Sequence, residues 1–336
     1  MSLFPKVGRN QPGLRVTWTL VVAVLCIGIF LHLIPFYFMI VTSLKTAPEI
    51  MRIPPTLLPE NPTLAAWQLV FQVSAGSTIL RQPLYQYFLN SCIMAFGTLA
   101  LSLPITSFAA YANSKLQRGR GARWTFLFFI GTLMVPAAVT LIPTFLLTRN
   151  FPFPVPTVPN IPGTETPFPV IRTWNTAWAV IIPGVFSAFN FLLFKGFFDT
   201  IPNSIIQAAR VDGGSEFNIF RRIVLPMSIP VFAVAAYLQF SGVWDSFMWP
   251  LLVIQDSTRS PMSVAIYNLI NVFMSTGTMR PQASLATNEQ IRQLQEAGLS
   301  WNGLVVLGIL QTIPIFIMFI VSRNYLLKGV KIRGLK

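Results

Sequence analysis

Six long apolar segments constrain the fold of this 336-residue chain more than any other feature. Each segment is long enough to cross a bilayer, which requires about 20 helical residues. Hydrophobic residues make up 53% of the chain and charged residues only 10%, far from the composition of a soluble domain. We therefore predict an all-α polytopic membrane protein with six transmembrane helices. The expected spans are 17–42, 87–112, 124–148, 176–198, 229–254 and 303–326.

Lysine and arginine residues predict how these spans are oriented. With six spans, both termini lie on the same side as the loops near 113–123 and 199–228, and that side carries sixteen of the 24 basic residues. Because basic residues stay in the cytoplasm, we expect both termini there, in a multi-pass protein of the cell (inner or plasma) membrane. The predicted plan is a tail 1–16, a transmembrane domain 17–326 containing a cytoplasmic loop 199–228, and a tail 327–336.

The rest of the composition argues against several kinds of site. The net charge of +14 comes from basic residues scattered over short segments, which is not the clustered surface of a nucleic-acid-binding protein. Cys26 and Cys92 fall inside predicted spans, where free cysteine behaves as a small hydrophobe. The single histidine, His32, cannot form a metal site alone. We expect no metal, no cofactor and no nucleic-acid partner.

Residues 207–226 form a polar stretch between two apolar spans and predict a structured loop. Gln207 to Arg210 favours a helix, and Asp212-Gly213-Gly214 favours a turn with permissive backbone dihedrals. Ser215 and Glu216 can start a second helix, which we expect to end at Pro226. A membrane protein with so ordered a loop is expected to use it as a docking surface.

The same stretch resembles the EAA motif of permease subunits in bacterial ABC importers. The matching residues are Ala208-Ala209, Asp212-Gly213, Ile223, Leu225 and Pro226. Further matches identify the chain as similar to the carbohydrate-uptake branch, of the maltose-transporter MalG type. They are Ser43-Leu44-Lys45, Pro59-Glu60-Asn61-Pro62-Thr63, Asn90-Ser91, Ala109-Ala110-Tyr111-Ala112, Ile142-Pro143, Phe197-Phe198, Ile201-Pro202, Trp244-Asp245-Ser246-Phe247 and Tyr325-Leu326-Leu327-Lys328-Gly329.

The resemblance implies that this loop docks in a cleft of a cytoplasmic ATPase and moves as a lever during alternating access. The chain departs from the family pattern at Gln207, where a Glu is usual, and at Gly214, where an Ala is usual and a glycine should loosen the turn. The residues to which the resemblance assigns coupling are Gln207, Ala208, Ala209, Asp212, Gly213, Gly214, Phe220, Ile223, Leu225 and Pro226.

The resemblance also implies the partners. They are a second, homologous permease, two copies of the ATPase, an extracytoplasmic solute-binding protein and membrane lipid. The chain has no Gly-rich phosphate-binding loop ending in Lys-Ser or Lys-Thr, so ATP hydrolysis is expected on a separate chain and this one is expected to be non-catalytic. The outer loops 149–175 and 255–302 are longer than is typical, and we assign them no family contacts.

Polar residues inside the spans are candidates for a translocation path, because a sugar requires uncharged hydrogen-bonding groups and aromatic walls. The alternative for each is a hydrogen bond between helices. The candidates are Asn90, Asn190, Gln239, Trp244, Asp245 and Gln311.

Two other classes of function compete with an importer of a sugar or oligosaccharide. A stand-alone secondary transporter or channel for a small polar solute would require broken repeats or charged residues deep in the membrane, and only Asp245 and His32 come near that. A membrane-embedded enzyme would require a cluster of catalytic groups, and one histidine with ten carboxylates, mostly in loops, offers none. Neither alternative explains the polar loop.

Overall fold

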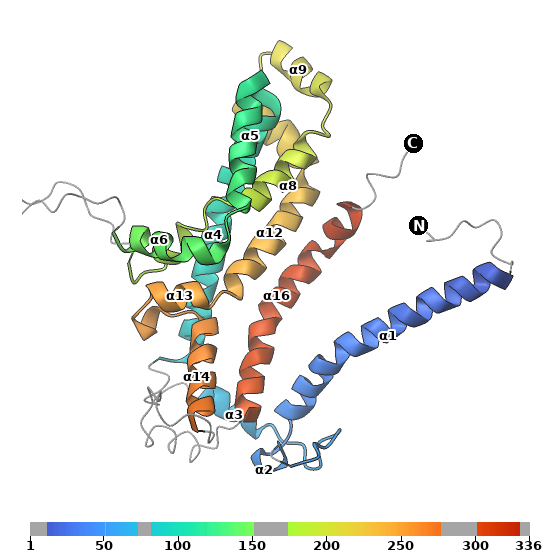
Figure 1. The fold of residues 1–336 in the computed structure, drawn as a ribbon, viewed down its shortest axis with the longest axis vertical. Helices are drawn as coiled ribbons and strands as arrows, with labels where there is room; N and C mark the ends of the chain where they lie inside the picture. Colours follow the sequence, from blue (N-terminus) through green and yellow to red (C-terminus); the bar gives the residue numbers. More distant parts are fainter. Residues whose placement is uncertain are drawn as a thin grey trace, which may run out of the picture. The chain divides into compact units, whose positions relative to one another are not determined.

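Helices make up all the regular structure in the residues that the computed structural model describes, which are 12–50, 52–72, 82–117, 119–150, 174–276 and 301–329 (Figure 1). The all-α prediction is therefore confirmed for these ranges. The α-helices are α1 (Pro12–Ser43), α2 (Ala47–Ile50), α3 (Ala65–Gln72), α4 (Leu84–Tyr111), α5 (Gly119–Leu133), α6 (Ala137–Asn150), α7 (Trp178–Ile181), α8 (Ala188–Phe198), α9 (Asn203–Val211), α10 (Glu216–Ile219), α11 (Leu225–Met227), α12 (Ile229–Trp244), α13 (Met248–Val253), α14 (Met262–Thr276) and α16 (Trp301–Gly329). Two π-helical segments, η2 (Ala112–Leu116) and η3 (Phe220–Val224), and one 3-10 turn, η4 (Ser257–Arg259), accompany them.

Several predicted regions lie wholly or partly outside the described residues. They are the ends of both tails, at 1–11 and 330–336, and most of the two outer loops, at 151–173 and 277–300.

The described residues form two compact units, and the first lies within Met1–Gln72 and Asn288–Ile309. Its longest helix, α1, is apolar around its whole circumference, which is typical of a membrane span. After α1 the carboxylate of Glu49 accepts hydrogen bonds from the Thr56 hydroxyl (2.8 Å) and the Glu60 N–H (3.0 Å). These bonds hold the loop that follows α1 in place.

The second unit lies within Val73–Thr287 and Leu310–Lys336, and α4 is its central element. Helices α8 and α12 pack along α4, while α9 and α14 lie toward its opposite ends (Figure 1). Thr98, Ser102 and Thr106 recur every four residues on α4 and are fully buried. Such small side chains on one helical face allow neighbouring helices to approach closely.

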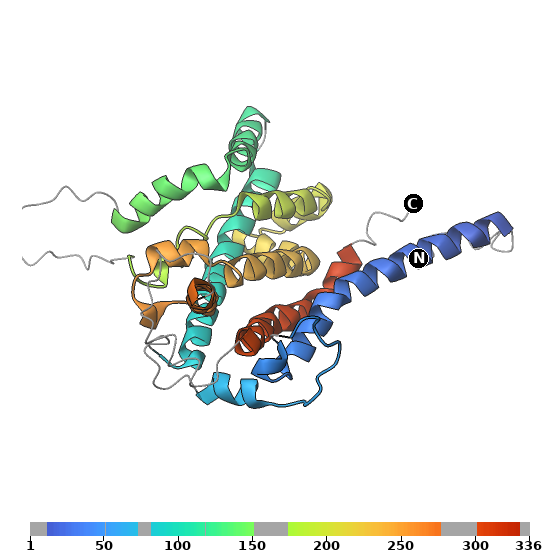
Figure 2. The same cartoon turned by 60° about the horizontal axis from the view of Figure 1, so that its bottom comes forward.

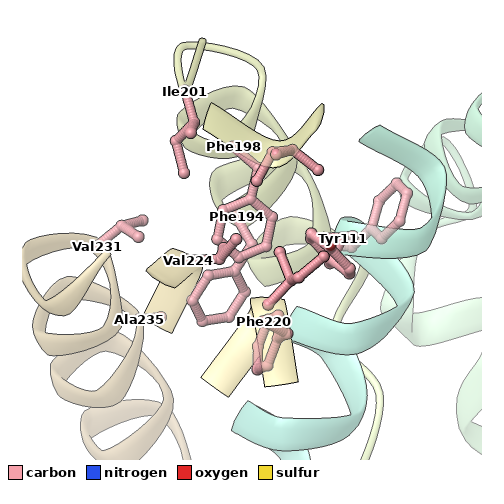
Figure 3. Close-up of a cluster of buried hydrophobic side chains, with 12 residues drawn as sticks. Tyr111, Phe194, Phe198, Ile201, Phe220, Val224, Val231 and Ala235 are labelled. Atoms are coloured by element: carbon pink, nitrogen blue, oxygen red, sulfur yellow. The ribbon is translucent and has the colours of Figure 1, made fainter. Parts of the chain in front are cut away.

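A cluster of buried apolar side chains joins α4, α8 and α12 to the polar loop. It contains Phe194 and Phe198 of α8, Phe220 and Val224 of η3, and Tyr111 of α4, all of which point toward one another (Figure 3). The loop is therefore packed onto the membrane helices by a hydrophobic core of its own.

One predicted span, 124–148, is two helices with a sharp bend between them. Helices α5 and α6 meet at an angle of 100° (Figures 1 and 2). Pro136 lies at the break, where it lacks an N–H for the helical ladder and disfavours helical dihedrals at Val135. The sequence analysis expected one continuous helix here.

The described residues contain three helices long and apolar enough to cross a membrane, or up to five if each bent pair is one span. The three long helices, Arg15–Ser43, Leu84–Leu116 and Trp301–Leu326, match predicted spans. The predicted spans 176–198 and 229–254 are each divided between two shorter helices, α7 with α8 and α12 with α13. The count of six spans stays a prediction.

Helix α14 lies within the predicted outer loop 255–302, where no helix was predicted for residues 262–276. Ser260 and Pro261 precede the helix, and the Ala265 N–H donates to the Pro261 carbonyl. A serine followed by proline is a helix-start signal, because proline tolerates the first helical position.

Candidate functional site

The turn in the polar loop is a Schellman motif that ends α9. The Gly214 N–H donates to the Ala209 carbonyl (2.9 Å), and the Gly213 N–H donates to the Arg210 carbonyl (3.0 Å). Gly213 has φ of +80°, a conformation that residues with a side chain rarely adopt. A Cβ on Gly214 would lie 2.8 Å from the Ala209 oxygen. Gly214 therefore closes this turn rather than loosening it.

The second helix of the loop begins as predicted but ends later. Ser215 caps α10, and its hydroxyl accepts from the Asn218 N–H (3.4 Å). Asp212 lies at the C-terminal cap of α9. The chain stays helical through η3 and α11, past Pro226, which is placed near the start of α11. The Ser228 hydroxyl donates to the Val224 carbonyl (2.6 Å) and so satisfies one acceptor in this region.

Helix α9 has two chemically different faces. Ile206 points into the buried cluster and is 2% exposed. Gln207, Ala208 and Val211 are exposed, and Val211 is 88% exposed. The outer face of α9 is therefore small and weakly polar, while its inner face is fixed to the protein.

Glu216 joins the two helices of the loop to α4. Its Oε1 accepts from Nε of Arg210 (2.6 Å), and its Oε2 accepts from the hydroxyl of Tyr111 (2.8 Å). Arg210 is on α9, Glu216 is the first residue of α10, and Tyr111 is the last residue of α4. One carboxylate thus ties the two neighbouring helices of the loop to α4, which lies about a hundred residues earlier.

Lys115, in η2, makes a second connection between the same parts. Its Nζ donates to the Ile201 carbonyl (2.8 Å) and to Oδ1 of Asn203 (3.0 Å). The Lys115 carbonyl accepts from Nη2 of Arg210 (3.3 Å). Lys115 is only 8% exposed, so these contacts are sheltered from water. We call Tyr111, Lys115, Arg210 and Glu216 the α4–α9 clamp.

The clamp pair is held ionised. The hydrogen bond from Arg210 lowers the pKa of Glu216, burial opposes this, and the hydrogen bond from Tyr111 lowers the pKa further. The hydrogen bond to Glu216 raises the pKa of Arg210 despite its partial burial. Both side chains keep their charges near neutral pH.

The predicted coupling residues occupy both sides of the loop. Phe220 is 3% exposed and belongs to the buried cluster. Partly exposed positions are Ala209, Gly214 and Ile223, and the exposed ones are Gln207, Ala208, Asp212, Gly213, Leu225 and Pro226. The motif therefore mixes residues that could meet a partner with residues that hold the loop in place.

The contacts among the four clamp residues were not predicted from the sequence. Arg210 and Glu216 are oppositely charged and flank the predicted turn, a signal that could have indicated their pairing. Tyr111 and Lys115 lie about a hundred residues earlier, and no local pattern links them to the loop.

Five of the six candidates for a translocation path make hydrogen bonds between elements. Nδ2 of Asn190 donates to Oε1 of Gln239 (2.8 Å), joining α8 to α12. Trp244 and Gln311 each donate from the side chain to the other's backbone carbonyl, at 2.9 and 3.0 Å. The remaining two of the six candidates are Asn90 and Asp245.

Asn90 donates from Nδ2 to the carbonyls of Thr258 (3.0 Å) and Ser260 (3.1 Å), which fixes the segment before α14. Asp245 caps α12 with its backbone, and its side chain is exposed. Among the six, only Asp245 has a side chain without a hydrogen bond to another described residue. Whether any of the six contacts a solute stays a prediction.

Comparisons with known proteins give a consistent family. Residues 102–332 match the family described as binding-protein-dependent transport system inner membrane component. The arabinooligosaccharides transport system permease protein AraQ of Halalkalibacterium halodurans is 23% identical over 95% of this chain and 96% of its own. The polygalacturonan/rhamnogalacturonan transport system permease protein YtcP of Bacillus subtilis is 24% identical over 90% and 92%. The sn-glycerol-3-phosphate transport system permease protein UgpE of Salmonella typhi is 26% identical over 91% and 92%.

A solved structure has a similar fold. It is a chain of a bacterial ABC transporter involved in the import of the acidic polysaccharide alginate, with a TM-score of 0.70 and 19% identity over 96% of this chain and 99% of that one. The family match covers more than half of the sequence and includes the whole polar loop. This chain therefore belongs to the inner-membrane permease components of binding-protein-dependent transport systems.

Proposed function

We propose that this chain is a permease subunit of an ATP-driven importer for a sugar or oligosaccharide, and that residues 203–227 couple it to a separate ATPase. Relatives named for arabinooligosaccharides and for polygalacturonan support the carbohydrate class. The relative named for sn-glycerol-3-phosphate makes a small phosphorylated polyol the second candidate.

The two faces of α9 carry this proposal. Its outer face offers Ala208 and Val211 to a partner, and small side chains there allow the cleft of another protein to approach the helix backbone closely. Its inner face is fixed by Ile206 and by Arg210. A partner that binds the free outer face of such a helix can displace it, and the fixed inner face transmits this displacement to the membrane helices.

The α4–α9 clamp transmits the displacement of α9 to α4. A displacement of α9 acts on α4 through Glu216 and Tyr111, and through Lys115 and the Ile201 carbonyl. Because α4 packs along α8 and α12, we propose that a rigid-body shift of the loop reorients these helices between inward-open and outward-open arrangements.

The orientation and partners follow from the same proposal. The loop and both termini face the cytoplasm, where the sixteen basic residues gather. Two ATPase copies lie below, a second permease lies alongside, and a solute-binding protein delivers the solute from outside. Of the six path candidates, we propose Asp245 as the one whose side chain remains available to a solute.

Co-purification tests the docking role. The chain is co-expressed with candidate ATPase subunits and recovered from membranes by a tag on the chain. Ala208→Trp places a large side chain on the outer face of α9, and we expect it to lose the ATPase. Gln207→Glu restores the family's usual residue at the neighbouring exposed position, and we expect it to retain the ATPase.

Equal recovery of an ATPase by Ala208→Trp and wild type would overturn the assignment of α9 as the docking helix. Solute uptake by the purified chain alone, without an ATPase, would instead favour a stand-alone transporter.

A further inference from the structure

A pocket of about 610 Å³ lies beside the clamp, and the proposed function assigns it no ligand. Its walls come from the middle and C-terminal part of α4, from α10, η3 and α11, and from the start of α12. The volume is within the range of about 300–1,000 Å³ that is typical of small-molecule sites. The pocket therefore has room for a ligand.

The pocket is apolar along its length and basic at one end. Phe96, Leu103 and Phe108 line it from α4, and Arg221 is the one charged residue among the lining residues. The ring of Phe108 stacks on Phe217 (6.0 Å between centroids) and lies close to Phe220 (4.5 Å). Arg221 directly follows Phe220, so its cation belongs to the Phe108 end.

The other end of the pocket lies deeper along the predicted span. Phe96 precedes Phe108 by twelve residues, or about 18 Å of helix. Phe96 contacts Phe240, near the middle of the span 229–254 (5.3 Å between ring centroids). The pocket thus runs from a cation beside the polar loop to an apolar end inside the membrane.

Arg221 has no carboxylate partner within the part of the chain that the structure describes, and its side chain is exposed. A lone cation at the mouth of an apolar pocket is complementary to an anionic amphiphile, because such a molecule is charged at one end and apolar along the rest of its length. We propose that this pocket binds an anionic phospholipid, with its phosphate at Arg221 and an acyl chain along α4 toward Phe96.

The pocket adjoins the polar loop, which moves as a rigid body in the proposed function. Phe220 lines the pocket and also belongs to the buried cluster that packs the loop onto α8 (Figure 3). A lipid held there stabilises this arrangement of η3 against α4, which makes the anionic lipid content of the membrane a regulator of the importer.

Lipid binding to the purified full chain tests the proposal. Native mass spectrometry compares phosphatidylglycerol with phosphatidylcholine of the same acyl chains. We expect preferential retention of phosphatidylglycerol by the wild-type chain. Arg221→Gln should lower the affinity for phosphatidylglycerol about fivefold, which is the usual effect of removing one basic residue that contacts anionic lipid. Ala100→Trp, which fills the pocket, should lower the affinity for both lipids.

Arg222→Gln is the matched control, because Arg222 is the adjacent exposed arginine and does not line the pocket. It removes the same charge and should leave the preference intact. Equal losses in Arg221→Gln and Arg222→Gln would reduce the effect to general surface charge and overturn the site. Normal lipid binding by Ala100→Trp would overturn the site, and loss of a co-expressed second permease by this variant, in a separate co-purification, would show that a protein partner fills the pocket instead. The measurement uses the chain alone, so its failure would leave the ATPase coupling role standing.

Discussion

The two ends of α4 are both tied to polar segments, but by different chemistry. At the N-terminal end, neutral side chains hold the segment before α14: Asn90 and Gln82 donate to backbone carbonyls, and the Ser91 hydroxyl accepts from the Met262 N–H (2.8 Å). At the C-terminal end, charged side chains of the α4–α9 clamp hold the polar loop.

This difference suggests different duties for the two ends. Amide and hydroxyl bonds to backbone groups keep their strength at any ordinary pH or salt concentration. Ion pairs with partial exposure respond to salt, pH and nearby charges. We infer that the neutral end is a fixed attachment and that the charged end transmits movement.

Removing the charged contacts at the C-terminal end of α4 should have the largest effect. Glu216→Leu removes the acceptor for both Arg210 and Tyr111. We expect solute-stimulated ATP hydrolysis by the reconstituted importer to fall about tenfold or more, because coupling free energies of about 1–3 kcal/mol correspond to factors of about 5–150. Hydrolysis and uptake in proteoliposomes measure this.

Gln82→Leu is the matched control at the neutral end, where it removes the bond to the Ser257 carbonyl. It should lower thermal stability but preserve the stimulation of hydrolysis. An equal loss of stimulation in both variants would break the distinction between the two ends.

A double-mutant cycle sharpens the comparison through stability. Tyr111→Phe and Glu216→Gln remove parts of one network, so their effects on the free energy of unfolding should be non-additive by about 1 kcal/mol. Tyr111→Phe and Gln82→Leu change residues about 40 Å apart along α4 and should be additive. Denaturant titrations in detergent give both values, and additivity in the first pair would argue against a connected clamp.

Substitutions in the turn between α9 and α10 should change the free energy of unfolding by a similar amount. Gly213→Ala should cost about 1–2 kcal/mol, because a Cβ is disfavoured in the left-handed conformation at φ of +80°. Gly213→Asn should cost less, since asparagine tolerates that conformation better. There is open space around Gly213, so a larger loss for asparagine would contradict the backbone explanation.

Changes of pH should have the smallest effect. The pKa of Glu216 is below its ordinary value, so its contribution to stability is complete above the ordinary value and is lost as pH falls through the lowered one. The difference in melting temperature between wild type and Glu216→Gln should stay constant from neutral to mildly acidic pH and shrink only in stronger acid. A difference that shrinks near neutral pH would contradict the ionised pair.

Local patterns predicted the parts of this structure that depend on local chemistry. The apolar runs located three long helices, and Asp212-Gly213-Gly214 located a turn that requires two glycines. The start of α10 also followed from a serine cap at Ser215. These features depend on neighbouring residues, which the sequence displays directly.

Tertiary contacts explain what the patterns missed. Pro226 did not end its helix, because it lies in the first turn of α11, where a helix tolerates a residue without an N–H. The clamp joins Tyr111 to Glu216 across 105 residues, and the packing of α8 against α4 and of the loop into the buried cluster brings them together. Pro136 was visible in the sequence, but the 100° bend at that position was not.

The most direct test of the central claim is a distance between α9 and the end of α4 in the assembled importer. Spin labels at Ile205→Cys, an exposed position of α9 outside the proposed docking residues, and at the exposed Leu116→Cys report it by double electron–electron resonance after Cys26 and Cys92 are replaced. The clamp predicts one narrow distance that is the same with and without ATP, and a broad distribution in Glu216→Leu. A distance that changes with ATP in the wild-type background would contradict the claim that the loop and α4 move as one body.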